Sequence, residues 1–245
     1  IDFKFQGALF LIAYFLHRRY TFKNYQKIGV AIHLNKSNNI SEIYNKVKNF
    51  PDFIHIDLID ETYNSENISI DIEMLHKIRE LWPQKKLQIH IMSKNPNFWI
   101  NQLPKSRNTE VFFHYDENVD VEQVSTLILS KNFIPGIVLH NQISESQIIK
   151  LMNLFSNFMV LCVKKAGFSG QVFQNKSSDL INELIKVTEQ VTDIKITLDG
   201  GITPKIASKF NVQEVVSASS VLNDEDSKKQ IINFQTSQKY QDSAQ

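Results

Sequence analysis

The feature that most constrains this chain is a regular alternation, from Lys27 onward, of short apolar runs with longer amphipathic stretches. The short runs have the length and the β-branched content of buried strands, and the stretches between them place apolar side chains at helical spacing, as at Ile72, Leu75 and Ile78. The expected strands are residues 27–34, 53–59, 87–92, 110–115, 134–140, 158–163, 193–199 and 213–219.

Eight strands that alternate with eight helices predict an α/β fold of the (β/α)₈ TIM barrel type. We expect residues 25–235 to form the barrel and residues 236–245 to form a polar tail. A doubly wound open sheet of the same elements is the alternative. Three side chains are expected to cap helix starts: Ser41, Ser144 and Thr203.

Residues 1–24 differ in character from the rest of the chain. Residues 7–16 are an unbroken apolar and aromatic run, and the basic residues Arg18 and Arg19 follow it closely. The run alone is too short to span ~30 Å of hydrocarbon, and it lacks the flanks of a secretory signal. Two interpretations stay open: a helix packed on the barrel, or the last half of a transmembrane helix whose basic residues face the cytoplasm.

Composition narrows the classes of function. The net charge is +1, so no long-range electrostatic field favours nucleic acid as a partner. The single cysteine, Cys162, excludes an intrachain disulfide and favours a reducing compartment.

Polar side chains stand near the carboxyl ends of three expected strands, where TIM barrels place their chemistry. His55 and Asp57 share one face of the second strand, His90 lies in the third, and Asp199 ends the seventh. Two imidazoles and two carboxylates at one rim predict a divalent metal site for zinc, iron or manganese. The other strand histidines are expected to be hydrogen-bonded core residues: His33, His114 and His140.

Glycine marks a second group of residues. Four of the seven glycines fall in two short motifs after the sixth and seventh expected strands, Gly167 and Gly170 in AGFSGQ and Gly200 and Gly201 in DGG. Glycine lets the backbone approach a ligand closely, and free amides at helix starts bind phosphate. Together with the SASS segment at 217–220, the motifs predict a phosphate site, the alternative being that they are plain turns.

Five fragments, in this order along the chain, resemble the ribulose-phosphate 3-epimerase family: HIDLID (55–60), IHIMSKNP (89–96), GFSGQVF (167–173), LDGGITP (198–204) and VVSASSV (215–221). The resemblance covers about residues 27–234. It implies a (β/α)₈ barrel that moves a proton at C3 of a ketopentose 5-phosphate. It also implies that His55, Asp57, His90 and Asp199 bind the metal, and that Asp57 and Asp199 are the acid/base pair on opposite faces of the substrate.

The same resemblance assigns the contacts to the sugar and its phosphate to a wider set of residues: His90, Met92, Gly167, Phe168, Ser169, Gly170, Gly200, Gly201, Ala218 and Ser219. This chain departs from the family pattern around the substrate. Ala31 stands where the family has a serine, Glu61 replaces a glycine, and Ile59 and Cys162 replace two methionines expected to shield the intermediate. The predicted metal ligands are kept, so the departures bear on the identity of the substrate.

A second resemblance concerns LIAYFLHRRYTF (11–22), which looks like the end of the last membrane helix of GtrA-like proteins. Those are small membrane proteins associated with moving lipid-linked sugars in surface polysaccharide synthesis. The resemblance implies a fusion in which a membrane unit precedes a barrel at the cytoplasmic face of a membrane.

Three functions follow from these patterns. The favoured one is an isomerase, a metal-dependent sugar-phosphate 3-epimerase that acts on a small phosphorylated sugar and is attached to a membrane through its N-terminus. The second is a barrel that only binds a sugar phosphate and regulates a membrane partner. The third is a decarboxylase relative on the same barrel. Such proteins resemble a D-x-K-x-x-D pattern, and DIKITLD (193–199) has one residue too many between Lys195 and Asp199 to match it. A homo-oligomer is compatible with each of the three.

Overall fold

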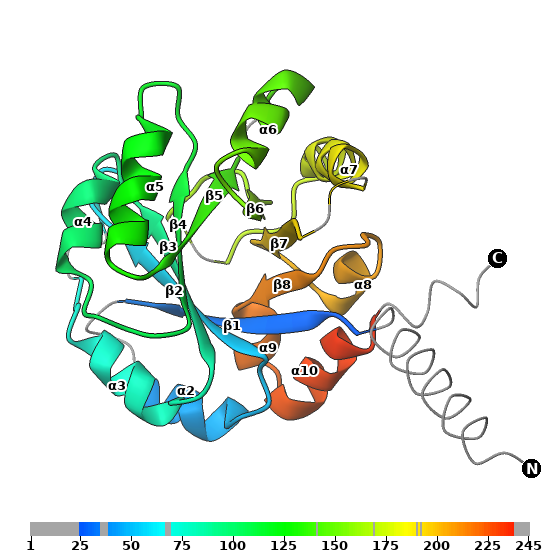
Figure 1. The fold of residues 1–245 in the computed structure, drawn as a ribbon. Helices are drawn as coiled ribbons and strands as arrows, with labels where there is room; N and C mark the ends of the chain where they lie inside the picture. Colours follow the sequence, from blue (N-terminus) through cyan, green and yellow to red (C-terminus); the bar gives the residue numbers. More distant parts are fainter. Residues whose placement is uncertain are drawn as a thin grey trace, which may run out of the picture.

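In a computed structural model, the chain is described at residues 25–34, 39–66, 70–140, 142–168, 170–189, 191 and 193–237. Within these ranges eight parallel strands close into a barrel, and their spatial order follows their order in the sequence (Figure 1). The strands are β1 (Lys27–His33), β2 (Phe53–Ile59), β3 (Lys86–Met92), β4 (Thr109–His114), β5 (Ile134–Leu139), β6 (Asn157–Leu161), β7 (Lys195–Asp199) and β8 (Glu214–Ser217). The predicted (β/α)₈ barrel is confirmed.

The pairing of the first strand with the last decides between the two expected folds. β1 pairs with β8 in parallel, with Lys27 opposite Glu214 and Val30 opposite Ser217. An open doubly wound sheet would leave these two strands without this pairing, so that alternative is wrong. Because the sheet closes, every second side chain of each strand lies inside the barrel.

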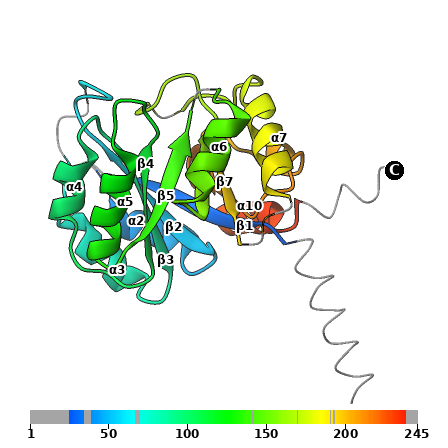
Figure 2. The same cartoon turned by 45° about the horizontal axis from the view of Figure 1, so that its top comes forward.

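Helices cover the outside of the barrel, as Figure 2 shows most clearly for α4 to α7. Each of α2 to α8 connects one strand to the next, while α9 and α10 follow β8, the last strand. The helices are α2 (Ile40–Val47), α3 (Met74–Leu81), α4 (Pro96–Gln102), α5 (Val121–Ser130), α6 (Glu145–Met152), α7 (Ser177–Thr188), α8 (Pro204–Ala207), α9 (Ser219–Leu222) and α10 (Ser227–Gln235).

Two of the three predicted helix caps are confirmed. Ser144 forms a complete capping box with Gln147 at the start of α6, and the Thr203 hydroxyl accepts from the Ile206 amide at the start of α8. The prediction for Ser41 is wrong, because α2 begins one residue before it, at Ile40. Its cap is Asn39, whose side-chain oxygen accepts from the Glu42 amide.

The terminal predictions fall outside the part of the chain that the structure describes. Residues 1–24 and 238–245 are not among the described residues, so both interpretations of the apolar run, and the division at 24 and 236, stay predictions. Among the described residues, no helix combines the length and the apolar content that crossing a bilayer requires.

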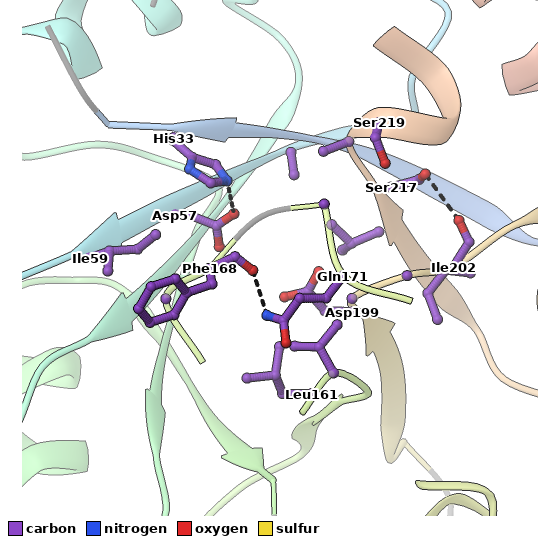
Figure 3. A pocket seen from close by; sticks show the side chains of 18 of the residues that line it. His33, Asp57, Ile59, Leu161, Phe168, Gln171, Asp199, Ile202, Ser217 and Ser219 are labelled. Carbon is purple, nitrogen blue, oxygen red and sulfur yellow. Dashed lines mark hydrogen bonds and ion pairs between the residues drawn. The ribbon is translucent and has the colours of Figure 1, made fainter. Parts of the chain in front are cut away.

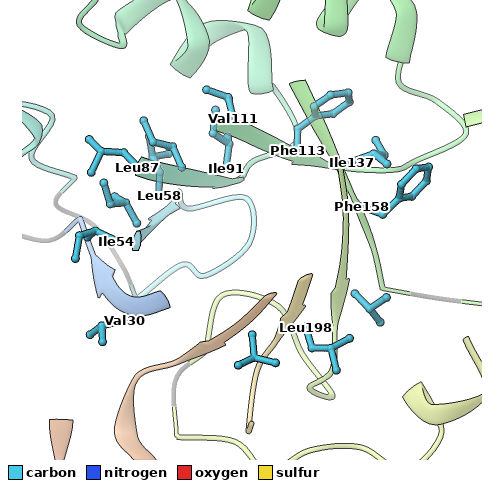
Figure 4. Packing of buried hydrophobic residues seen from close by; sticks show 14 of the residues in the cluster. Val30, Ile54, Leu58, Leu87, Ile91, Val111, Phe113, Ile137, Phe158 and Leu198 are labelled. Carbon is cyan, nitrogen blue, oxygen red and sulfur yellow. The ribbon is translucent and has the colours of Figure 1, made fainter. Parts of the chain in front are cut away.

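The main hydrophobic core lies between the strands and the helices. Side chains such as Ile54, Leu58 and Ile91 point outward from the barrel and pack in one buried cluster that includes Ile78 of α3 and Leu184 of α7 (Figure 4). A smaller apolar cluster fills part of the interior, with contributions from several strands: Ile59, Met92, Phe112, Val138, Met159 and Leu161. The alternation of the strands thus separates an outer core from an interior that also holds polar groups.

Four of these interior polar groups form what we call the barrel-base network: Lys86, Glu110, Lys195 and Glu214. The Lys86 Nζ lies 2.7 Å from Glu214 Oε1 and 3.0 Å from Glu110 Oε2. Lys195 also pairs with Glu110, and its Nζ lies 3.6 Å from Glu214 Oε2. Burial would raise the pKa of Glu110, but Lys86 and Lys195 outweigh it and keep that pKa below its usual value. Two lysines therefore neutralise two buried carboxylates at the amino end of the barrel.

We expect Glu214→Gln to lower the free energy of unfolding by about 3 kcal/mol, because it removes one partner from a buried set of ion pairs. Urea unfolding of the metal-free protein measures this loss. The matched control is Glu73→Gln on the surface, where a 3.8 Å pair with His76 is exposed to water and about 0.5 kcal/mol or less is expected. Equal effects of the two substitutions would contradict a stabilising role for the network.

Candidate metal and sugar-phosphate site

The structure brings the four predicted metal ligands together inside the mouth of the barrel. His55 and Asp57 lie on β2, His90 lies on β3 directly opposite Asp57, and Asp199 ends β7. All four side chains are buried, and one ligand atom from each lies within 4.8 Å of those of the others. The sequence therefore identified a real cluster, even though its members come from strands far apart in the chain.

The spacing of the ligand atoms fits a single divalent ion. His55 Nε2 lies 3.1 Å from Asp57 Oδ1 and 3.8 Å from Asp199 Oδ2. His90 Nδ1 lies 3.3 Å from each of the same two oxygens. Four ligands about 2.0 Å from a tetrahedral ion stand roughly 3.3 Å apart, so the observed separations bracket that value.

One atom of the cluster points to a ligand most directly. The Nδ1 of His90 is buried and makes no hydrogen bond of acceptable geometry with any residue that the structure describes. Two carboxylate oxygens are close enough for such a bond, but they are not aligned with it. This is the arrangement expected of ligand atoms directed at a common centre, so the residues fit a metal.

Charges in the cluster shift the pKa values of its members. Burial would lower the pKa of His90, but Asp199 and Asp57 outweigh it and raise that pKa to about 9. The pKa of His55 is also raised, because Asp57 outweighs its burial. Burial would raise the pKa of Asp57, yet His55 holds it well below its usual value. Without metal, the raised pKa of His90 therefore favours a protonated imidazole that offsets part of the charge of the carboxylates.

A pocket opens above the cluster at the carboxyl end of the barrel (Figure 3). Asp57 and Asp199 reach it from β2 and β7, while His55 and His90 lie buried beneath it. Most of the predicted substrate contacts line this pocket: Met92, Gly167, Phe168, Gly170, Gly200, Gly201, Ala218 and Ser219. Ser169 lies outside the described residues, so its predicted contact stays a prediction.

The glycines of the pocket wall have conformations that other residues rarely adopt. Gly200 has φ +96° and Gly201 has φ +68°, and Gly167 and Gly170 also have positive φ. A side chain at Gly200 would lie 2.7 Å from a methyl of Val163, and one at Gly201 would collide with the backbone at Phe173. The DGG motif is thus required by the tight approach of the β7 loop to the β6 loop.

Comparisons with known proteins agree with this geometry. The sequence profile of the ribulose-phosphate 3 epimerase family matches residues 22–222. The chain belongs to this family. A ribulose-phosphate 3-epimerase from Buchnera aphidicola subsp. Acyrthosiphon pisum is 23% identical over 152 residues, which are 62% of this chain and 66% of the relative. The chain thus spans just under two thirds of that relative's length.

Solved structures with the same fold include members of other enzyme classes. The 3-hexulose-6-phosphate synthase of Salmonella typhimurium matches with a TM-score of 0.61 and 14% identity over 86% of this chain and 98% of that one. The 3-keto-L-gulonate-6-phosphate decarboxylase of Vibrio cholerae O1 matches with a TM-score of 0.65 and 10% identity over 88% of this chain and 98% of that one. At these identities the likeness concerns the fold alone.

Two predictions about individual side chains in this epimerase-family pocket are wrong. His33 was expected in the core, but its ring lines the pocket and its Nε2 lies 3.5 Å from Asp57 Oδ2 (Figure 3). Cys162 was expected to face the intermediate, but it points into the outer core and Leu161 faces the pocket instead. Side chains alternate along a strand, so misplacing the register by one residue exchanges the two faces.

The other two strand histidines are hydrogen-bonded, as predicted. His140 Nε2 donates to the Val163 carbonyl at 2.9 Å. His114 lies closer to the metal ligands than expected, because its Nε2 is 2.9 Å from the Nε2 of His90. Burial lowers the pKa of His114 well below its usual value, so its ring is neutral and accepts the hydrogen bond that His90 donates.

Two loops beside the pocket are held by side chains that sequence reasoning did not assign. Asp60 accepts hydrogen bonds from Thr62 and, at 2.9 Å, from the Trp99 indole. Gln171 fixes the loop after β6 by donating to the carbonyls of Lys165 and Phe168. The fragments HIDLID and GFSGQVF contain Asp60 and Gln171, so the signal was present in the family resemblance.

The raised pKa of His90 predicts how pH affects metal binding. A metal must displace the proton of His90, so the metal Kd is expected to fall as pH rises from 6.5 towards 9, by up to tenfold per pH unit. In the metal-free protein the sign is opposite: the protonated His90 stabilises the fold fully below its unfolded pKa of about 6.5, and this contribution is lost as pH rises through 9.

Competition with a chelator at several pH values measures the Kd, and thermal unfolding with and without metal measures the two opposing trends. An affinity that does not change with pH would contradict a protonated His90 in the metal-free site.

Proposed function

We propose that this chain is a metal-dependent sugar-phosphate 3-epimerase that interconverts ribulose 5-phosphate and xylulose 5-phosphate or a close analogue. The observation that carries the proposal is the pair Asp57 and Asp199. These carboxylates come from β2 and β7, reach one pocket, and share one cluster of ligand atoms with two histidines. Inverting a carbon centre by proton transfer needs an acid and a base on opposite faces of the substrate, and two such carboxylates supply them.

Each carboxylate has one oxygen directed into the cluster and a second oxygen for proton transfer. Asp57 Oδ1 faces His55 and His90, while its Oδ2 lies on the side of His33. The lowered pKa of Asp57 keeps this group ionised and ready to accept the C3 proton. Asp199, which in this direction begins the turnover with a proton, gives that proton to the opposite face of C3 and is left ionised. Asp57 keeps the proton it removed, so the two carboxyl groups exchange roles in the reverse direction.

His55, Asp57, His90 and Asp199 would hold the metal, which when bound supplies a Lewis acid that makes the C3 proton more acidic and stabilises the negative charge of the enediolate. The residues fit zinc, iron or manganese, since imidazole and carboxylate ligands suit all three. Apolar side chains above the cluster limit the access of water to the intermediate: Ile59, Met92, Leu161 and Val163.

The opposite wall of the pocket suits the phosphate of the substrate. The pocket is lined there by Gly170, Gly200, Gly201 and Ser219, and backbone amides together with a hydroxyl are donors that can bind a phosphate. A sugar phosphate held there by its 5-phosphate would extend its C3 towards the two aspartates. The names of the family and of the Buchnera relative support this class of substrate.

The lysine on which the decarboxylase alternative depends does not lie in the pocket. Lys195, the lysine of the DIKITLD motif, begins β7 and belongs to the barrel-base network, at the end of the barrel opposite the pocket. Among the described residues, Lys195 is not one of those that line the pocket. A membrane attachment through residues 1–24, with a role in polysaccharide synthesis, stays a prediction, because those residues lie outside the described part of the chain.

Exchange of solvent deuterium tests the two-aspartate mechanism. Wild-type protein with metal in deuterated water is expected to interconvert the two pentulose phosphates and to place deuterium at C3 of both. Asp57→Asn and Asp199→Asn should each lower interconversion by about 10²-fold or more. Each variant should still exchange the C3 proton of one epimer, because the remaining carboxylate faces the C3 proton of that epimer only.

Mass spectrometry of the recovered sugars gives the readout, and Asp179→Asn on the surface of α7 is the control that should match wild type. The proposal fails if wild-type protein shows neither exchange nor interconversion, and the assignment of roles fails if either aspartate variant keeps full activity.

Metal content separates an epimerase from the alternative of a barrel that only binds a sugar phosphate. We expect one divalent ion per chain by elemental analysis, and we expect His90→Ala to lose it, because Nδ1 of His90 is a ligand atom in the proposed site. His76→Ala, which changes an exposed histidine of α3, should keep the metal. Protein that folds normally but holds no metal after incubation with zinc, iron or manganese would favour the binding-only barrel.

A further inference from the structure

Gln88 connects the barrel-base network to the metal cluster. It lies on β3 beside His55 of β2, and its side chain is completely buried. The Gln88 Nε2 is 3.1 Å from Glu110 Oε2 and 3.4 Å from Glu214 Oε2. Its Oε1 is 2.7 Å from His55 Nδ1. One amide side chain therefore touches two carboxylates on one side and a proposed metal ligand on the other.

The chemistry of these neighbours fixes the orientation of the amide. An ionised carboxylate only accepts hydrogen bonds, so the NH₂ group of Gln88 must face Glu110 and Glu214. Lys86 and Lys195 pair with both carboxylates and hold them in place. The amide oxygen is then left to face His55, and an oxygen can only accept. His55 must therefore carry a proton on Nδ1.

This proton decides which nitrogen of His55 is free to bind a metal. A neutral imidazole has one N–H and one lone pair, so a proton on Nδ1 places the lone pair on Nε2. Nε2 is the atom that faces the cluster, 3.1 Å from Asp57 Oδ1 and 3.8 Å from Asp199 Oδ2. The tautomer of His55 that Gln88 selects is therefore the one that leaves Nε2 free to bind a metal.

We propose that Gln88 is a positioning residue for the metal, which holds His55 in the tautomer and ring orientation that direct Nε2 to the ion. The inference rests on the proposed metal-dependent function and adds the residue that prepares one of its ligands. Histidine ligands of metals generally donate their second N–H to an acceptor, and loss of that acceptor typically weakens metal binding 10- to 100-fold. Here the acceptor is a neutral amide whose direction is set by two buried glutamates.

Three substitutions in the same layer of the barrel separate positioning from packing. Gln88→Met keeps the length of the side chain and removes the acceptor. Gln88→Glu keeps an oxygen that accepts from His55 Nδ1. Thr197→Val is the matched control. The Thr197 hydroxyl donates to Glu214 Oε2 at 3.4 Å, beside the barrel-base network, and makes no hydrogen bond with His55 in the part of the chain that the structure describes.

The experiment measures the Kd for zinc of each full-length variant by competition with a chromophoric chelator, alongside thermal unfolding of the metal-free protein. We expect Gln88→Met to weaken zinc binding by 10-fold or more. Gln88→Glu should stay within about threefold of wild type, and so should Thr197→Val, even where either lowers thermal stability. In zinc-loaded protein, proton NMR should show the His55 Nδ1–H resonance in wild type and Gln88→Glu, and its loss or shift in Gln88→Met.

The outcomes distinguish this inference from the function on which it rests. Wild-type protein that binds no zinc would overturn the proposed metal-dependent function and the role of Gln88 together. Wild-type protein that binds zinc, with Gln88→Met equally tight, would overturn the role of Gln88 alone. If Gln88→Met does not fold, Gln88→Glu still decides, since weakened binding in that folded variant would show that an acceptor at this position is not what the site requires.

Discussion

The interior of this barrel contains two groups of charges, and neither can exist without compensation. Moving an ion out of water is costly unless an opposite charge is close. At the amino end, two lysines offset two glutamates within the protein itself. At the mouth, Asp57 and Asp199 face two histidines, and protons on the imidazoles or a divalent cation would balance the two negative charges equally well. Proton and metal are therefore competing solutions to one electrostatic requirement.

The fold and the four-residue cluster were predictable because they depend on local periodicity and on one general rule about barrels. The strand ranges follow from apolar alternation, and the rule that chemistry gathers at the carboxyl ends of the strands led from His55, Asp57, His90 and Asp199 to a shared site. It was harder to predict whether a single strand side chain points into the barrel or outward. At the end of β6 the family resemblance placed Cys162 towards the intermediate, whereas the alternation of the strand turns its neighbour Leu161 into the pocket.

The barrel-base network could not be predicted from local pattern. Lys86 and Lys195 each begin a strand, where a charged residue normally marks the surface. Only closure of the sheet brings Lys86 to Glu214 and Lys195 to Glu110, which are 128 and 85 residues away in the sequence. The same holds for Gln88, whose importance depends on contacts with three other strands. His33 was missed for a related reason, since its neighbour Asp57 comes from the next strand.

The loops around the pocket are joined across the mouth of the barrel. The Asn64 side chain, in the loop after β2, donates to the Gly167 carbonyl, in the loop after β6, at 2.9 Å. Asp60 ties the first of these loops to α4 through Trp99. The two loops are thus linked directly across the mouth, although about a hundred residues separate them. Anyone who transplants the glycine-rich loop from another family member into this chain has to transplant its partner after β2 as well.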